Sequence, residues 1–141
     1  MARGLKKLET VVERLLSAKG CPWDRAQTHK SLIPYLREES KELADALRGG
    51  RWHEIEDELG DILFHIYFHS KIAEKAGTFS ISDVAENQAV KLMRRHPHVF
   101  GKHRKFKNEK DVRTHWNEIK SVERALRAKE VTLRDKKRRR S

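Results

Sequence analysis

Apolar side chains recur along most of this chain at the three- and four-residue spacing of one helical face. Near the start, Leu5, Leu8, Val12, Leu15 and Leu16 follow that spacing, as the buried stripe of an amphipathic helix does. Glycines and capping serines stand where several of these stretches end or begin. The pattern predicts five helices, over about residues 3–18, 31–48, 52–76, 80–95 and 109–132.

The segments between these stretches lack helical periodicity. Residues 20–30 and 95–106 are rich in residues typical of loops, and the chain after Thr132 is almost entirely polar and basic. We therefore expect one domain over residues 1–131 and a basic, disordered tail over 132–141.

Composition favours an all-α fold. The chain has 141 residues, which fits one domain, and it contains three prolines and no Asn-Gly or Asp-Gly hairpin turn. We expect a bundle of antiparallel helices with a small core, which oligomerisation could enlarge.

Cysteine usage and hydropathy bear on the compartment. Cys21 is the one cysteine, so an internal disulfide is excluded, and this suits a reducing cytoplasm. No apolar run is long enough for a membrane span, and the first residues do not have the pattern of a signal peptide. We expect a cytoplasmic protein.

The net charge of +11 is uneven along the chain. Residues 134–141 hold six Lys or Arg and one Asp, so they contribute +5 and the remaining residues +6. A basic body with a strongly basic tail suits polyanionic ligands, and nucleic acid is one of them.

Four carboxylates form two pairs with matching spacing. Glu39 and Glu42 are three residues apart on the second predicted helix, and Glu58 and Asp61 are three apart on the third. Each pair shares a helical face, and the glycines at 49 and 50 allow the helices to fold back as an antiparallel hairpin. The four oxygen donors would then converge on a hard cation, Mg²⁺ with Mn²⁺ as a substitute.

The alternative for these acidic residues is a solvated helix face. The second pair argues against it, because the apolar residues Leu59, Ile62 and Leu63 surround it. Carboxylates near a core boundary need compensation, and a bound cation provides it.

Basic residues downstream are candidates for binding phosphate. Lys91 and Arg95 are four residues apart with Arg94 beside them, and Trp116 and Lys120 are four apart on the last predicted helix. Lys and Arg bind phosphate oxygens, and Trp116 could stack on a base or sugar. From spacing alone, a solvated basic face with a core tryptophan is the favoured alternative.

Two histidines on the third predicted helix have a spacing also seen in zinc sites. His65 and His69 are four apart, but no Glu follows His65, so the HExxH motif is absent. We expect packing or polar-face roles for both, with His65 one turn from Asp61.

Several motifs together resemble the MazG family of nucleoside triphosphate pyrophosphohydrolases. The resemblance covers about residues 5–125 and rests on five segments: CPWDRAQTH (21–29), LREESKELADAL (36–47), EDELGDILFHIYFH (56–69), KLMRRHPHVFG (91–101) and WNEIKSVER (116–124). It implies a helical bundle that dimerises and an Mg²⁺-dependent hydrolysis of nucleoside triphosphate to monophosphate and pyrophosphate, for nucleotide-pool control or housecleaning.

The resemblance also implies residue roles. The family's metal ligands fall on Glu39, Glu42, Glu58 and Asp61, and Glu38 is auxiliary. Glu38 or Glu42 would accept the proton of the attacking water. The family's substrate-binding positions fall on Lys91, Arg95, Trp116 and Lys120, with Arg94 adjoining.

The chain departs from the family in two respects. Many members carry two such domains in tandem, whereas this chain has one, and the terminal KKRRR is outside the pattern. A competing hypothesis is a binding module without turnover, which holds nucleic acid or an acidic partner through the tail and Arg94, Arg95, Arg104 and Lys105. A di-metal oxidoreductase bundle is a weaker alternative, since its Glu-x-x-His pairs are missing.

Overall fold

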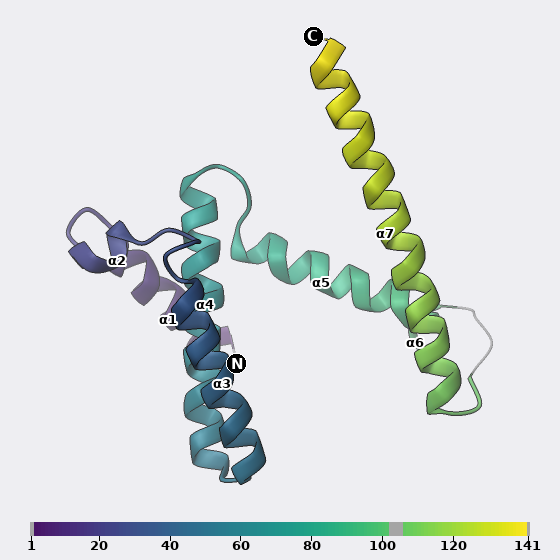
Figure 1. Ribbon diagram of the computed structural model, residues 1–141. Helices are drawn as coiled ribbons and strands as arrows, with labels where there is room; N and C mark the ends of the chain where they lie inside the picture. Colours follow the sequence, from purple (N-terminus) through teal and green to yellow (C-terminus); the bar gives the residue numbers. More distant parts are fainter. Residues whose placement is uncertain (1, 102–105, 141) are drawn as a thin grey trace. The chain divides into compact units, whose positions relative to one another are not determined.

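The computed structural model describes residues 2–101 and 106–140, and the regular secondary structure within them is all helical, with turns and loops between the helices (Figure 1). The predicted all-α class is confirmed. The helices are α1 (Ala2–Leu15), α2 (Pro22–Ala26), α3 (Ile33–Gly49), α4 (Trp52–Lys75), α5 (Ile81–Arg95), α6 (Pro97–Phe100) and α7 (Glu109–Arg140). In this part of the chain, none of the helices has the length and hydropathy needed to cross a membrane.

The chain divides into two compact units, residues 1–85 and 86–141. The single domain expected over residues 1–131 stays a prediction. The first unit contains α1 to α4 and the start of α5, and the second contains the rest of α5, α6 and α7.

The core of the first unit lies where α1 packs against α4. Val12, Leu16, Leu32 and Phe68 are buried there, with partly buried apolar side chains around them. The predicted stripe of the first helix supplies Val12 and Leu16, so hydrophobic burial along that stripe fixes α1 on α4.

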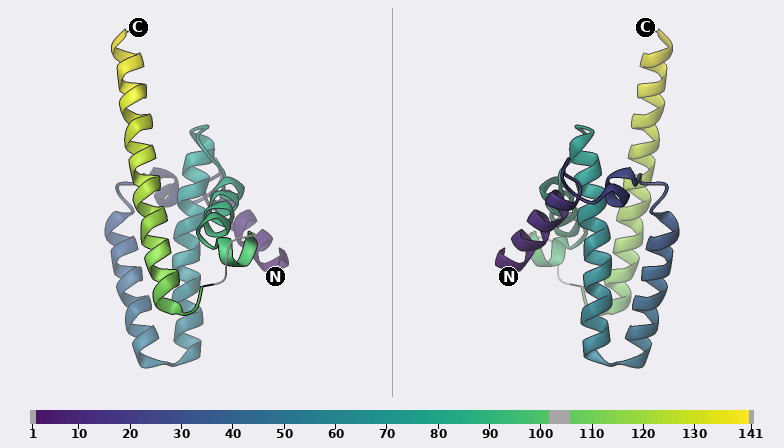
Figure 2. Two further views of the ribbon diagram at one scale, coloured as in Figure 1. Left: turned by 90° about the vertical axis from the view of Figure 1, so that its right-hand side faces the viewer. Right: turned by 90° about the vertical axis from the view of Figure 1, so that its left-hand side faces the viewer.

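Helices α3 and α4 lie side by side in opposite directions, joined by a short turn (Figures 1 and 2). Gly50 ends α3 with a φ of +70°, and its N–H donates to the carbonyl of Ala46 over 3.1 Å. This left-handed conformation favours glycine. The hairpin expected from the glycines at 49 and 50 is therefore present.

The boundaries of other elements follow local capping. Pro34 lies in the first turn of α3, as expected, and Ser80 precedes α5 and exchanges hydrogen bonds with Asp83, including one from the Asp83 N–H to Ser80 Oγ over 3.2 Å. This reciprocal pattern is a capping box. Two short helices, α2 and α6, lie in segments predicted to be irregular, and each starts at a proline.

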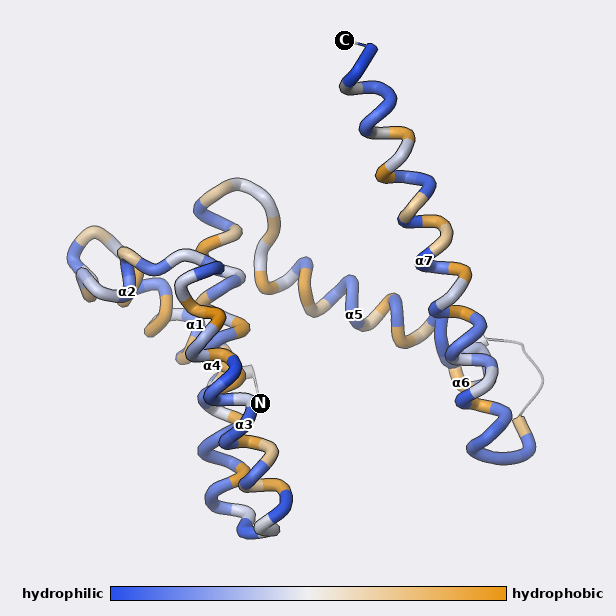
Figure 3. The backbone as a smooth tube through the Cα atoms, in the orientation of Figure 1, coloured by the Kyte–Doolittle hydropathy of each residue, from blue (hydrophilic) through white to orange (hydrophobic). Residues whose placement is uncertain are grey.

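The last helix is longer than predicted. The sequence predicted a disordered tail from residue 132, whereas α7 continues to Arg140. Lys and Arg are good helix formers, which accounts for a helix in a segment without an apolar stripe. Figure 3 shows the hydrophilic character of the end of α7.

Candidate metal centre

Three carboxylates from two helices converge in the first unit. Glu39 of α3 and Glu58 and Asp61 of α4 each offer one oxygen, and these oxygens lie within 4.8 Å of one another. All three side chains are half-buried. Among the described residues, this is the one group of three such side chains that could hold a metal ion.

The turn at Gly50 and the helical spacing explain this convergence. Because Glu58 and Asp61 are one turn apart, they project from the same face of α4. Glu39 lies on the neighbouring helix α3, which the turn folds back along α4. The cluster is therefore a product of the hairpin.

The cluster contains orphaned acceptors. Oε2 of Glu39 and Oε2 of Glu58 are both buried and have no hydrogen-bond partner among the described residues. Buried polar atoms without a partner are rare and costly. A cation among the three carboxylates would satisfy both oxygens, and an all-oxygen donor set is the type that Mg²⁺ prefers.

The pKa values reflect the strain in this arrangement. Burial raises the pKa of Glu39 to about 7, and the neighbouring carboxyl groups add to the increase. Burial also raises the pKa of Glu58, and the charges of Glu42 and then Asp61 add to it. Desolvation and like charges both disfavour a carboxylate, so the metal-free cluster retains protons that a cation would displace.

The remaining two predicted acids lie at the edge of the cluster. Glu42 and Glu38 are both exposed on α3. Glu42 is close enough for its charge to raise the pKa values of Glu39 and Glu58, although none of its oxygens belongs to the group of three. The structure thus brings together three of the four predicted ligands and places the fourth beside them.

A shallow hollow of about 420 Å³ adjoins the cluster on α4. Asp61 belongs to both, and the other lining residues are His53, Glu56, Asp57 and Gly60. Apart from Asp61, none of these residues was predicted from the sequence. They follow one another at helical spacing, and Gly60 leaves the hollow without a side chain at that turn.

The histidines of α4 lie beyond the cluster. His65 is 8% exposed, and burial lowers its pKa against the opposing effect of Asp61. The ring nitrogens Nδ1 of His69 and His29 are 2.8 Å apart, which ties the segment before α3 to α4. Neither His65 nor His69 belongs to the group of metal-ligating atoms.

The predicted phosphate-binding residues all lie in the second unit. Lys91 on α5 and Lys120 on α7 are half-buried and have no ion-pair partner among the described residues. Arg94 and Arg95 both bind Glu123 of α7, at 2.6 and 2.7 Å. Of the basic residues named for the binding-module hypothesis, Arg104 and Lys105 lie outside the described residues.

Glu123, the partner of Arg94 and Arg95, could not be identified from the sequence pattern. Its side chain is 13% exposed, and the hydrogen bond from Arg95 lowers its pKa to about 2, against an opposing effect of burial and with further support from Arg94. Arg95 also lies over the ring of Trp116, 5.0 Å from its centroid. Glu123 therefore holds Arg94 and Arg95 together, and Arg95 in turn contacts Trp116.

Comparison with known proteins gives a family. The MazG nucleotide pyrophosphohydrolase domain matches residues 27–100, which include the acidic cluster and the basic residues of α5. The chain is 42% identical over 118 residues to the nucleoside triphosphate pyrophosphohydrolase/pyrophosphatase MazG of Thermotoga maritima, covering 84% of this chain and 44% of that protein.

Other relatives give the same picture. The chain is 37% identical over 132 residues to the nucleoside triphosphate pyrophosphohydrolase of Escherichia coli K12, covering 93% of this chain and 50% of that protein. It is 41% identical over 114 residues to the uncharacterised protein YabN of Bacillus subtilis, covering 81% and 23%. The chain spans about half the length of the first two relatives.

Proposed function

The chain belongs to the MazG nucleotide pyrophosphohydrolase domain family, and on this premise we propose that it hydrolyses nucleoside triphosphates. The reaction consumes water and yields nucleoside monophosphate and pyrophosphate. The observation that carries the proposal is the convergence of Glu39, Glu58 and Asp61 with two buried, unpartnered oxygens. Such a cluster suits a hydrolase whose substrate arrives with a divalent cation.

Glu39, Glu58 and Asp61 would hold Mg²⁺, with Glu42 as the fourth ligand proposed from the sequence. A triphosphate is too highly charged to approach these carboxylates without a cation between them. Bound Mg²⁺ supplies this charge neutralisation and makes a bound water more acidic. Mn²⁺ has similar ligand preferences and would substitute.

Glu42 and Glu38 are the proposed acceptors of the proton from the attacking water. Both are exposed, so both reach water. Glu42 is electrostatically coupled to the cluster, since its charge raises the pKa values of Glu39 and Glu58. A general base must lie within hydrogen-bond reach of the attacking water, and this favours Glu42.

The basic residues of the second unit would bind the phosphate chain and the nucleoside. Two guanidinium groups, Arg94 and Arg95, share one carboxylate, Glu123, so a positive charge is left over in this cluster. Nε of Arg95 is buried and has no hydrogen-bond partner in the part of the chain that the structure describes. With Lys91 and Lys120, these groups would stabilise charge that develops on the leaving pyrophosphate, while Trp116 would contact the base or sugar.

We expect the protein to act in the cytoplasm as a homodimer or higher homo-oligomer that controls or cleans the nucleotide pool. Leu47 and Leu59, on the α3–α4 hairpin, are 56% and 50% exposed. Large apolar side chains exposed on neighbouring helices are typical of an interface, and the buried core of the first unit is small.

The test is pyrophosphate release from a panel of ribo- and deoxyribonucleoside triphosphates, with Mg²⁺ and with EDTA. We expect metal-dependent release, with an equal amount of the matching monophosphate measured by chromatography. A folded protein that binds Mg²⁺ but releases pyrophosphate from none of the substrates would refute the proposal.

A further inference from the structure

The two compact units differ sharply in charge. Residues 86–141 contain nineteen Lys and Arg against seven Asp and Glu, whereas residues 1–85 contain thirteen against fourteen. The second unit therefore carries +12 and the first −1. Hydrolysis of a triphosphate requires only a few basic groups beside the substrate. The second unit has several times more basic residues than that, even after its acidic residues are subtracted.

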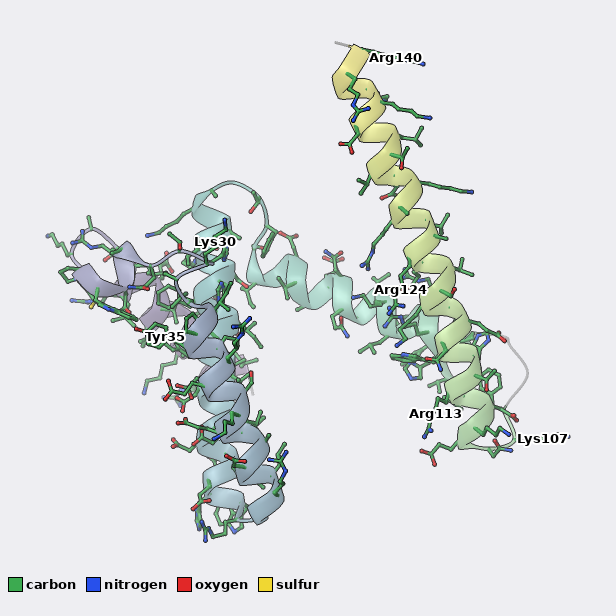
Figure 4. All side chains as sticks on the ribbon, viewed as in Figure 1. Lys30, Tyr35, Lys107, Arg113, Arg124 and Arg140 are labelled. Atoms are coloured by element: carbon green, nitrogen blue, oxygen red, sulfur yellow. The ribbon has the colours of Figure 1, made fainter. Side chains whose placement is uncertain are left out.

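Much of the excess lies on the second half of α7. Residues 124–140 form part of one uninterrupted helix and contain nine Lys or Arg and two acidic residues. Figure 4 shows side chains projecting from several sides of α7 between Arg124 and Arg140. At about 1.5 Å per residue, this stretch is about 25 Å long.

Three of these basic side chains are available to a ligand. Arg124, Arg127 and Lys129 are exposed, and they make no ion pair within the described residues. Arg94 and Arg95 differ from them, because Glu123 already binds both. Unpaired cations on successive turns of one helix repel one another, and a polyanion would remove this repulsion.

The composition of α7 selects among polyanions. Leu126, Val131 and Leu133 are exposed in the first part of this stretch, but no apolar residue follows Leu133, so the last turns offer nothing to insert into a lipid bilayer. No aromatic residue follows Trp116, so this stretch lacks the stacking side chains typical of single-strand binding. Contacts to the phosphate backbone of a duplex need neither feature.

We propose that residues 124–140 of α7 bind duplex DNA through its phosphates, without sequence preference. An α-helix is about 10–12 Å wide and fits the DNA major groove of about 12 Å, whereas the major groove of duplex RNA is too narrow. The nine basic residues along about 25 Å of helix match the dense row of phosphates on a duplex. This binding is separate from the proposed hydrolysis.

The test is fluorescence anisotropy of the full chain with a labelled 20-base-pair DNA duplex of arbitrary sequence, at several salt concentrations. The test variant replaces four exposed residues of α7 with Gln: Arg127, Lys129, Lys136 and Arg139. The control variant removes the same amount of charge from the first unit, because four basic residues there are replaced with Gln: Lys7, Arg14, Lys19 and Lys30. Circular dichroism establishes that both variants keep their helices.

We expect the wild-type protein to bind several unrelated duplex sequences equally well. The α7 variant should bind at least about tenfold more weakly near 0.1 M salt, and the slope of log affinity against log salt should fall by about 3 to 4. The control variant should retain most of the affinity. Pyrophosphate release should be unchanged in both.

Three outcomes would overturn the proposal. The first is no duplex binding by the wild-type protein at low salt. The second is an equal loss of affinity in the control variant, since the affinity would then depend on the net charge of the chain and not on α7. The third is binding of vesicles containing anionic phosphatidylglycerol, or of single strands, more tightly than duplex DNA.

Discussion

At the scale of single residues, the acidic cluster is a set of groups that destabilise one another until a cation arrives. Glu39, Glu58 and Asp61 lie close together, and two of their oxygens are buried without partners. Such a site lowers the free energy of unfolding of the metal-free protein, and metal binding raises it again.

Replacing Asp61 with Asn should separate catalysis from stability. We expect Mg²⁺-dependent pyrophosphate release to fall at least about 100-fold, because even residues that only orient metal ligands contribute 10- to 100-fold. Without metal, the variant should melt at a higher temperature than wild type, since one repelling charge is gone. Glu86→Gln, an exposed change on α5, is the matched control and should alter neither quantity. Full turnover in Asp61→Asn would remove this residue from the mechanism.

The raised pKa of Glu39 predicts how the stability of the metal-free protein depends on pH. Its carboxyl has a pKa of about 7 in the folded chain and about 4.5 in the unfolded chain. Between these values the folded state binds more protons at this group, so the contribution of Glu39 to the free energy of unfolding should fall as pH rises from about 4.5 to 7. The difference between the melting curves of wild type and Glu39→Gln in EDTA should show this fall.

Magnesium should reverse the trend. Because binding displaces protons, the stabilisation by Mg²⁺ should grow with pH over the same interval. Glu39→Gln should flatten the EDTA profile. Burial lowers the pKa of His65, which gives the opposite trend below about pH 6.5. The comparison with Glu39→Gln is therefore decisive: an EDTA profile identical to that of wild type would show that Glu39 is not a buried, cluster-forming acid.

Spacing could identify the acids but could not rank them. Glu39 and Glu42 are equivalent in a helical repeat, yet Glu39 is half-buried and Glu42 exposed. The rotation of α3 about its own axis decides this, and packing against α4 sets that rotation. Glu123 was missed for a related reason, because its partners Arg94 and Arg95 lie on a different helix, about 30 positions earlier.

At the scale of elements, the turn at Gly50 sets the distance between the two halves of the acidic cluster. Gly50 has a φ of +70°, whereas Gly49 ends α3 with ordinary backbone, and neither position has an atom within 4 Å of an added Cβ. Space is thus available at both positions, and they differ only in backbone conformation.

Alanine at these two glycines should give opposite results. Gly50→Ala should lower the free energy of unfolding by about 1 kcal/mol, because an L-residue is strained at positive φ. Gly49→Ala should leave it unchanged or raise it slightly, since alanine favours a helix. Urea unfolding followed by circular dichroism measures both. Equal effects would show that the left-handed turn does not position the hairpin.

The long helices were predictable because each carries an apolar stripe or a clear cap. The predicted segments 31–48 and 52–76 correspond closely to α3 and α4. Helices α2 and α6 were not predicted, because five or four residues are too few to show a period. The end of α7 was missed because it is helical through the propensity of Lys and Arg, without a stripe.

At the scale of the whole molecule, the sequence predicted an all-α chain but not its division into two compact units. The pattern of helices is continuous through the boundary, which falls inside α5. A division of this kind depends on which helices pack together. That information lies in long-range contacts, which local periodicity does not contain.

Self-association gives a prediction at this scale. Leu59 is 50% exposed on α4, next to the acidic cluster. If it lies in the proposed homodimer interface, Leu59→Glu should shift the molecular mass measured by sedimentation equilibrium toward that of the monomer. Val131→Glu, at a similarly exposed position on α7, is the control. A wild-type protein that is monomeric at high concentration would refute the dimer.

The separation of charge between the two units has a practical consequence for attaching this protein to a surface. The second unit carries +12 and the first −1, so a negatively charged resin such as heparin would capture the chain by its second unit. The acidic unit would have no attraction to the matrix. Orientation on the support would therefore come from the native sequence, without an added tag.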